Sequence, residues 1–291
     1  MSVVRVASPA LLKRLRAYRA RTFHTAPGSR VRSQDEAIEF VDERGFAFFW
    51  PIKEVNLPSL WVAVAGDRPV ADAHDDPGHV TWGWKDSLLG QRRWYYAKVL
   101  RHRSTLISLR VAPYFYALSE NFGAPEEDYL LQYEQGLLST DAKQIYETLL
   151  REGALHTIQL RRAAGLNQAG SDYRFNRALL ELEADFKVLP IGVAQAGAWR
   201  YAFICDIVAR HFPHLPDQAR AITHGQARHK LAELYLCSVG AARVQDLVKL
   251  FGWKRDAAER ALGVLAERGL LRGGVDLGGQ GSDWFVLSKL L

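Results

Sequence analysis

Cysteine, methionine and long apolar stretches are all scarce in this chain of 291 residues. Because Cys205 and Cys237 are the only cysteines, neither a disulfide framework nor a cysteine-based zinc site is expected, and both thiols are predicted to be buried. No apolar run approaches the roughly 18 residues that span a bilayer, and residues 1–10 lack the features of a secretory signal. We therefore expect a cytoplasmic protein with no membrane partner.

The motifs of familiar enzyme classes are missing as well. The chain has no Gly-x-Ser-x-Gly elbow, no His-Glu-x-x-His zinc motif, no dinucleotide-binding fingerprint and no EF-hand loop. The sequence therefore leaves open whether the chain is an enzyme, and we expect no cofactor.

One polar cluster follows the first quarter of the chain, and it consists of Asp72, His74, Asp75, Asp76 and His79. Imidazole and carboxylate groups bind divalent cations, so a metal site is one interpretation. Pro77 and Gly78 interrupt the cluster, and a turn in which Asp and His side chains cap backbone groups explains the same residues. We favour the turn and predict no metal. Three carboxylates are candidates for activating a water molecule: Glu54, Asp75 and Asp76.

Basic residues are in excess, which favours a polyanionic partner. Lys and Arg number 38 against 32 acidic residues, a formal charge of +6. Between residues 82 and 110, basic and aromatic residues alternate, and on a helix Trp94, Lys98 and Arg101 would share one face. Such a ridge binds bases and phosphates together, whereas in the alternative interpretation the aromatic residues are core and the basic ones are solvated. The candidate DNA contacts here are Lys85, Arg92, Arg93, Trp94, Lys98 and Arg101.

The N-terminal elements are predicted from caps and periodicity. A helix is expected over residues 8–22 and a second one after Ser33, which forms a capping box with Glu36, and Gly45 ends this second helix. A short aromatic strand follows at residues 46–50, and residues 60–65 read as a buried strand or a short helix.

A pattern of three helices and a hairpin then occurs twice. Its first copy has helices at residues 140–152, 157–164 and 172–186, with Ser139 and Ser171 as N-caps, and strands at 187–193 and 199–204. Its second copy has helices at 216–236, 243–251 and 254–268 and a hairpin at 270–287. The glycines of that hairpin, which include Gly279 and Gly281, predict a flexible tip.

This order predicts tandem winged-helix units in a mainly α fold with small β hairpins, of the α+β class. The expected domains are an N-terminal winged-helix-like unit at 1–135, a central winged helix at 136–212 and a C-terminal one at 213–291. In such units the third helix enters the major groove. The basic residues on or beside the third helices are therefore candidate DNA contacts: Arg174, Arg177, Lys254 and Arg255.

The tandem units and the Gly-aromatic strand from Gly45 to Trp50 resemble the winged-helix DNA glycosylases of the YcaQ/AlkZ type, and most closely the AlkZ-related proteins. This resemblance implies DNA as the partner and a role in repairing alkylated or crosslinked DNA. In the glycosylases, the strand carries a Gln followed two residues later by Gln or Asp, and this pair is thought to position the attacking water. The matching positions here are Phe48 and Trp50, which are more typical of core than of a base-stacking wedge.

Three functions are consistent with the sequence. The first is a monomeric DNA-binding protein that acts on damaged or structured DNA. The second is a DNA glycosylase that hydrolyses N-glycosidic bonds with other residues, drawn from Glu54, Asp75 and Asp76. The third is a transcriptional regulator that reads base edges with its third helices.

Overall fold

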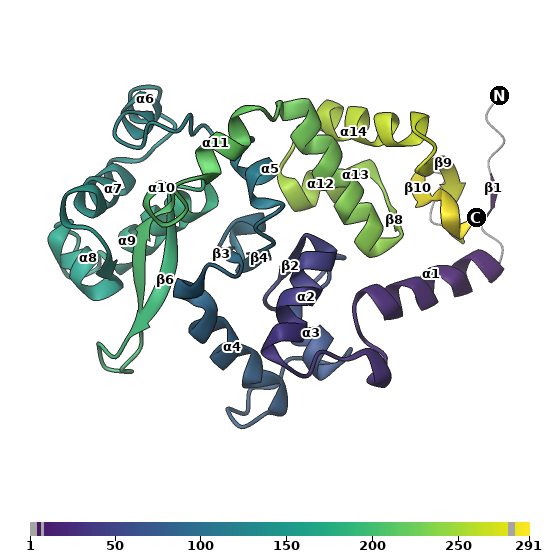
Figure 1. Ribbon diagram of the computed structural model, residues 1–291, viewed down its shortest axis with the longest axis horizontal. Helices are drawn as coiled ribbons and strands as arrows, with labels where there is room; N and C mark the ends of the chain where they lie inside the picture. The colour runs from purple at the N-terminus through teal and green to yellow at the C-terminus, as the bar shows by residue number, and fades with distance from the viewer. Residues whose placement is uncertain (1–4, 7–8, 279–282) are drawn as a thin grey trace. The chain divides into compact units, whose positions relative to one another are not determined.

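The computed structural model describes residues 5–6, 9–278 and 283–291. The chain forms two compact units (Figure 1). We call them the terminal unit, Met1–Trp82 with Leu106–Ser108 and His224–Leu291, and the central unit, Gly83–Thr105 with Leu109–Thr223. The predicted division into three domains stays a prediction.

The first part of the terminal unit is helical around one short strand. Its elements are α1 (Pro9–Thr22), η1 (Pro27–Ser29), α2 (Gln34–Arg44), β2 (Phe46–Phe48), α3 (Leu60–Ala65) and η2 (Pro77–His79). The Ser33 hydroxyl accepts from the Glu36 amide, and Gly45, at φ 80°, ends α2 by donating to the Val41 carbonyl. Both predicted ends of α2 are thus confirmed, and residues 60–65 take the helical alternative.

The last part of the terminal unit contains the second predicted repeat. Its elements are α12 (His224–Val239), β8 (Ala241–Ala242), α13 (Val244–Phe251), α14 (Arg255–Glu267), β9 (Leu271–Asp276), β10 (Trp284–Leu287) and η5 (Ser288–Leu290). The strands form a sheet in the order β1-β9-β10-β8, in which β1 (Arg5–Val6) runs parallel to β9. The hairpin glycines Gly279 and Gly281 lie outside the described residues.

Helix α1 packs across the C-terminal end of α12 and satisfies its last carbonyl groups. Tyr18 donates to the Cys237 carbonyl at 2.5 Å, Thr22 to that of Ser238 at 2.7 Å, and Arg19 Nε to that of Val239 at 2.7 Å. Gly240 follows at φ 78°, and a Cβ there would lie 2.6 Å from Leu15. The close approach of the two helices therefore requires this glycine.

The central unit contains the first predicted repeat behind a group of short elements. The short elements are η3 (Leu89–Gln91), β3 (Tyr95–Ala97), η4 (Leu100–His102), α5 (Ala112–Tyr116) and α6 (Asp128–Glu134). The repeat comprises α7 (Thr140–Glu152), β5 (Leu155–His156), α8 (Thr157–Ala163), α9 (Asp172–Ala184), β6 (Val188–Ala194) and β7 (Ala202–Ile207), followed by α10 (Val208–His211) and α11 (Leu215–Arg220). Two elements cross between the units, α4 (Val80–Leu88) and β4 (Thr105–Ile107).

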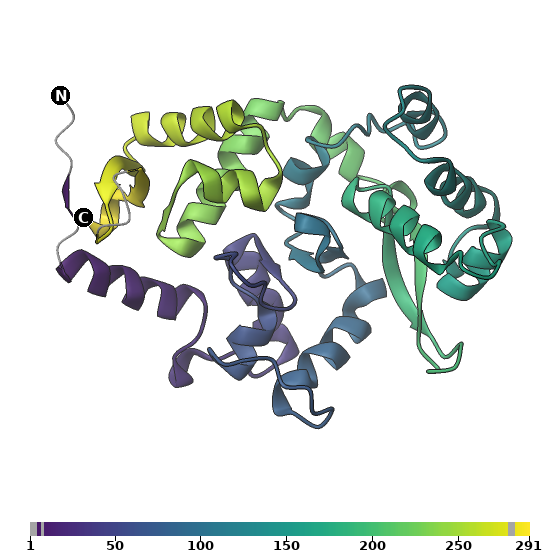
Figure 2. The same cartoon turned by 180° about the vertical axis from the view of Figure 1, so that it is seen from behind.

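The three helices of this repeat enclose an apolar core that includes Ile145, Leu160 and Leu182, and β5, β7 and β6 form an antiparallel sheet beside them. The β6–β7 hairpin extends beyond α7, α8 and α9 in both views (Figures 1 and 2). The predicted order of three helices and a hairpin is confirmed in both repeats, and so is the mainly helical α+β class.

Four predictions about these elements are wrong. The expected helix over residues 216–236 is two helices, α11 and α12, and the β-branched Ile222 and Thr223, which are poor helix formers, lie at the break. The Ser171 hydroxyl does not cap α9, because it donates to the carbonyls of Leu166 and Gln168. The second strand of the first hairpin begins at Ala202, so Trp199 lies in the connecting loop. Cys205 is buried, but Cys237 is only half-buried.

Candidate nucleic-acid interface

The strand that follows α2 carries aromatic side chains into the interior of the terminal unit. Phe48 is fully buried, and its amide donates to the Pro58 carbonyl at 3.0 Å. Trp50 is half-buried and stacks on Trp61 at 6.1 Å, with His79 and Trp82 against its edges at 5.6 and 6.1 Å. The core interpretation of this segment is confirmed for Phe48. Neither side chain can accept a proton from water.

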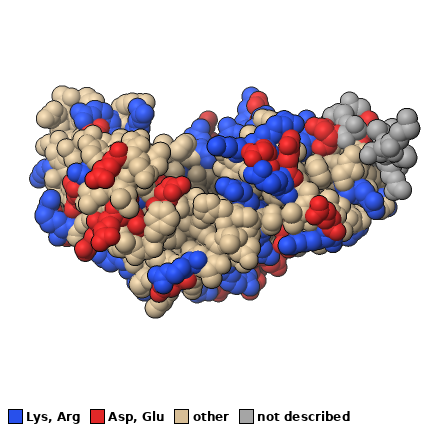
Figure 3. All heavy atoms as spheres, turned by 90° about the horizontal axis from the view of Figure 1, so that it is seen from above, with Lys and Arg blue, Asp and Glu red and all other residues tan. Residues whose placement is uncertain are grey.

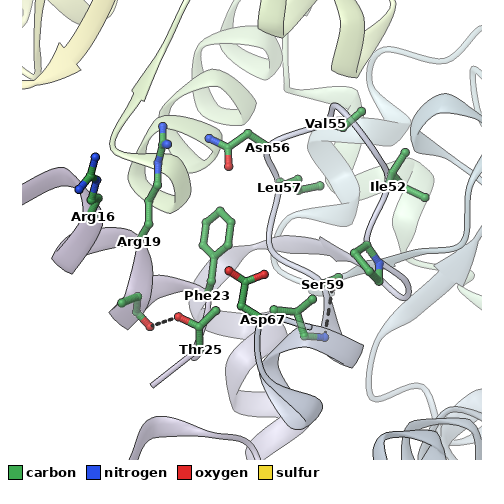
Figure 4. Close-up of a pocket in the computed structure, with 13 residues that line it drawn as sticks. Arg16, Arg19, Phe23, Thr25, Ile52, Val55, Asn56, Leu57, Ser59 and Asp67 are labelled. Carbon is green, nitrogen blue, oxygen red and sulfur yellow. Dashed lines mark hydrogen bonds between the residues drawn. The ribbon is translucent and has the colours of Figure 1, made fainter. Parts of the chain in front are cut away.

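A pocket of about 520 Å³ lies directly beyond this strand, within the terminal unit. We call it the Phe23 pocket. One wall is the end of α1 with Arg16, Arg19 and Phe23, and the opposite wall is the loop from Pro51 to Leu57. Figure 4 shows the Phe23 ring and the Asp67 carboxylate pointing into the same space, with the Asn56 amide beside it, and Arg19 also lines the pocket. The lining thus combines an aromatic ring, an amide and charges of both signs.

A second pocket, of about 400 Å³, shares Arg19, Val55 and Asn56 with the first. We call it the Trp284 pocket. Arg243 lies over the Trp284 ring at 4.8 Å and pairs with Asp246 at 3.4 Å. Lys249 and Glu54 also line it. The loop from Val55 to Asn56 is therefore exposed to two neighbouring pockets that both hold guanidinium groups.

The three predicted carboxylates do not come together. Glu54 lines the Trp284 pocket, where its backbone has φ 63°. Asp75 is exposed and does not line either pocket, and Asp76 pairs with Arg68 at 2.6 Å. The hydrogen bond and charge of Arg68 lower the pKa of Asp76. An ion-paired carboxylate with a lowered pKa is a poor general base at neutral pH.

The cluster around Asp76 has the turn role that the sequence predicts. Asp76 accepts from the Gly78 amide at 2.7 Å as the N-cap of η2, and His79 Nε2 lies 3.0 Å from the Ala71 carbonyl. Among the described residues, no group of three or more His, Cys, Asp or Glu side chains is arranged to hold a metal ion. Asp72 and His74 are both exposed.

The helix predicted to carry a ridge of basic and aromatic residues between residues 82 and 110 does not form. Trp94 and Lys98 cannot share a helix face with Arg101, because β3 and η4 take the place of the expected helix. The backbone also has a positive φ, outside the helical range, at Arg92 and at Arg101. Trp94 is buried at 3% exposure. Three successive aromatic residues have no helical spacing, and a buried strand accommodates them better.

Lys85 is also buried, at 2% exposure, so it is not available to DNA. Its ammonium group contacts Asp86, donates to Tyr201 at 3.0 Å and lies over the Phe203 ring at 4.6 Å. Burial lowers the pKa of this lysine. Lys98 is half-buried beside Glu183 at 3.8 Å. Arg92, Arg93 and Arg101 are exposed, as predicted for candidate contacts.

Of the third-helix candidates, Arg174, Arg177, Lys254 and Arg255 are all exposed. Arg174 is paired with Asp141 and Arg255 with Glu259. Arg177 makes no ion pair within the part of the chain that the structure describes, and it lines a pocket with Tyr173 and His102. Arg177 is therefore the third-helix arginine of the central unit that is available to an anion.

Sequence reasoning missed several exposed or pocket-lining residues. Trp199, in the β6–β7 loop, is 91% exposed, and Tyr173 on α9 is 72% exposed. Gly197 indicates the loop, but the predicted strand begins three residues too early and so includes Trp199. Phe23, Asn56 and Asp67 come from separate segments, and no sequence spacing links them.

Comparison with known proteins identifies the family. The AlkZ-related family matches residues 31–252, and the chain therefore belongs to it. No curated protein matches the chain. The solved structure of the Streptomyces sahachiroi DNA glycosylase AlkZ is similar, with a TM-score of 0.57 and 15% identity over 96% of this chain and 70% of that one. At this identity the likeness shows the fold alone. No helix among the described residues is long and apolar enough to cross a membrane.

Proposed function

We propose that this chain is a DNA-binding protein that acts on damaged or structured DNA. We further propose that Phe48 and Trp50, at the positions of the glycosylases' polar pair, do not hydrolyse an N-glycosidic bond. One observation carries the proposal: in the central unit, an exposed tryptophan on the hairpin loop accompanies an exposed tyrosine on α9 and Arg177, which makes no ion pair with any residue that the structure describes. Exposed aromatic rings stack on bases, and an arginine neutralises phosphate.

Further basic side chains of the same unit support phosphate binding. Arg92 and Arg93 are exposed in the segment before β3, and Arg101 is exposed in η4. Membership of the AlkZ-related family and the fold shared with a DNA glycosylase support DNA as the polyanion. We also propose that residues 136–212 and 213–291 act as winged-helix domains of a cytoplasmic monomer.

The aromatic strand supports binding over catalysis. A glycosylase needs a group that positions or deprotonates water beside the deoxyribose, and Phe48 and Trp50 offer no such group. Phe48 is fully buried, so it is also inaccessible to a sugar.

The test is a fluorescence anisotropy titration of a labelled duplex with the full chain, repeated at several salt concentrations. The logarithm of the binding constant is expected to fall with the logarithm of salt by about 0.9 for each phosphate contacted. Undetectable binding at low salt would contradict the proposal.

A second measurement tests the catalytic part. Duplexes carrying alkylated bases are incubated with the chain and then treated with alkali, which cleaves at abasic sites. We expect no cleavage above the level without protein, and accumulating abasic sites would show that other residues catalyse hydrolysis.

A selection from random duplexes is expected to return no enriched sequence, whereas a single enriched motif would favour a transcriptional regulator.

A further inference from the structure

The Phe23 pocket has the composition of a site for a flat, polar ring. Its volume of about 520 Å³ lies within the range of roughly 300 to 1,000 Å³ for small-molecule sites. Ile52, Val55 and Leu57 line the pocket along the loop after β2, and Asn56 and Asp67 supply polar groups. An aromatic ring with a few convergent hydrogen-bonding groups binds a ligand that is planar and has donors and acceptors at its edge.

Phe23 is held in place by the end of α1. Its amide donates to the Arg19 carbonyl at 2.8 Å, and the chain then turns at His24, which has φ 56°. The His24 ring packs on the edge of Phe40 at 5.2 Å, which anchors the turn to the core. The Phe23 ring is half-buried and points into the pocket (Figure 4). One ring therefore remains accessible for stacking without rearrangement of the helix.

Asp67 is presented by a turn that is fixed on both sides. Gly66 has φ 88°, a left-handed backbone conformation that favours glycine, and it packs against the Arg30 guanidinium. Arg68 pairs with Asp76 and lies over the Trp61 ring at 4.8 Å. The Asp67 side chain between them is exposed and faces the pocket (Figure 4).

The charges of the pocket argue against a bare phosphate as its main ligand. Arg16 and Arg19 are offset in part by Asp67, and Arg19 already donates to the Val239 carbonyl at 2.7 Å. A carboxylate accepts hydrogen bonds from the amino or imino groups of a base, and an amide both donates and accepts. These partners fit the edge of a nucleobase better than a phosphate.

We propose that the Phe23 pocket binds an unpaired nucleobase of DNA, with the base stacked on Phe23 and its polar edge on Asn56 and Asp67. This inference rests on the proposed DNA binding and names the structural feature of DNA that is recognised. A base inside a duplex is not accessible to such a pocket, so the site selects bulged, mismatched or single-stranded positions, where unstacking costs least.

The experiment compares two DNA probes with the full chain. One is a duplex with a single bulged 2-aminopurine, and the other is the same duplex with that base paired. The wild-type chain is expected to bind the bulged probe more tightly and to change its 2-aminopurine emission. Phe23→Leu, which keeps the bulk but removes the stacking ring, is expected to weaken binding of the bulged probe about tenfold. Asp67→Asn is expected to weaken it severalfold, with binding of the paired probe unchanged for both variants.

Two control variants complete the design. Asp72→Asn removes an exposed carboxylate outside the pocket, and Phe122→Leu removes a ring that is 70% exposed in the central unit. Both are expected to bind the two probes like the wild type. If Phe23→Leu does not fold, Asp67→Asn still tests the site, because its carboxylate is exposed and is replaced by an amide of the same shape.

The outcomes separate this inference from the proposed function. Equal binding of the two probes, or a preference that survives both pocket variants, overturns the nucleobase site and leaves DNA binding intact. Binding of neither probe at low salt overturns the proposed function itself. A preference for the bulged probe that both pocket variants abolish supports the site.

Discussion

The two three-helix repeats have the same order of elements but different exposed surfaces. On α9 of the central unit, Tyr173 is 72% exposed, and Arg177 makes no ion pair among the described residues. On α14 of the terminal unit, Arg255 pairs with Glu259 and Arg260 with Asp256, each at 2.8 Å and four residues apart. Helix α14 runs along the top of Figure 1, and Figure 3 shows blue and red side chains intermixed there.

The buried residues of the two third helices also differ, because α9 buries a charged side chain and α14 does not. The buried residues of α14 are all alanine or leucine, whereas α9 buries Glu183, whose carboxylate accepts from the Lys98 amide at 2.8 Å. The two ion pairs of α14 stabilise the helix and neutralise four of its exposed charges. Repetition of an architecture therefore does not imply repetition of function, and the central repeat is the better candidate for DNA contact.

The largest effect is expected at the exposed hairpin loop. Trp199→Ala should weaken DNA binding about tenfold, because a tryptophan that is 91% exposed has a stacking surface to lose and little core packing. Anisotropy titration with single-stranded and duplex DNA measures the change. Leu270→Ala, at a 43% exposed residue beside the other hairpin, is the matched control and should bind like the wild type. Equal losses in the two variants would remove the contrast between the repeats.

A smaller effect is expected from single charges on the third helices. Arg177→Gln should weaken duplex binding severalfold and reduce the salt slope by about 0.9, since one phosphate contact is lost. Arg260→Gln should change neither, because Arg260 is already engaged with Asp256. A salt slope that falls for Arg260→Gln and not for Arg177→Gln would assign DNA contact to the terminal repeat instead.

The smallest effect concerns the buried carboxylate. Burial raises the pKa of Glu183 above its ordinary value, so the folded state binds the proton more tightly than the unfolded state does. The stabilisation from this group is complete below the ordinary glutamate pKa and is lost as the pH rises through the raised value. Urea titrations across that pH range should show that the free energy of unfolding depends less on pH in Glu183→Gln than in the wild type.

The control for this prediction is Glu267→Gln, at an exposed position at the end of α14. Its pH profile should follow that of the wild type. A Glu183→Gln profile that also follows the wild type would mean that burial of this carboxylate does not contribute to pH sensitivity.

Much of the fold follows from local sequence signals. Capping residues such as Ser33 and Ser139, and the glycines that end helices at 45 and 153, determine helix ends through contacts within a few residues. The wrong helix between residues 82 and 110 has a different cause. Its aromatic residues are buried by segments distant in sequence, as in the stacking of Tyr95 on Phe186 at 4.4 Å, and tertiary burial outweighs local periodicity there.

The site was less predictable than the fold. Basic residue type alone selected Lys85, although its ammonium group is enclosed by Tyr201 and Phe203. Both pockets are built from α1 and the loop after β2, and the Trp284 pocket also takes side chains from the C-terminal part of the chain, where Trp284 lies 265 residues after Arg19. The sequence does predict Glu54, which lines the Trp284 pocket, and the exposed Arg177, and it matches Phe48 and Trp50 to the polar pair of the glycosylases.

Hydrogen–deuterium exchange of the full chain with and without duplex DNA tests the central contrast most directly. Amides at a binding surface are expected to exchange more slowly in the complex. We expect slower exchange in peptides that cover α9 and residues 195–201, and unchanged exchange in α14. Slower exchange confined to α14 and the β9–β10 hairpin, with no change in the central repeat, would contradict this expectation.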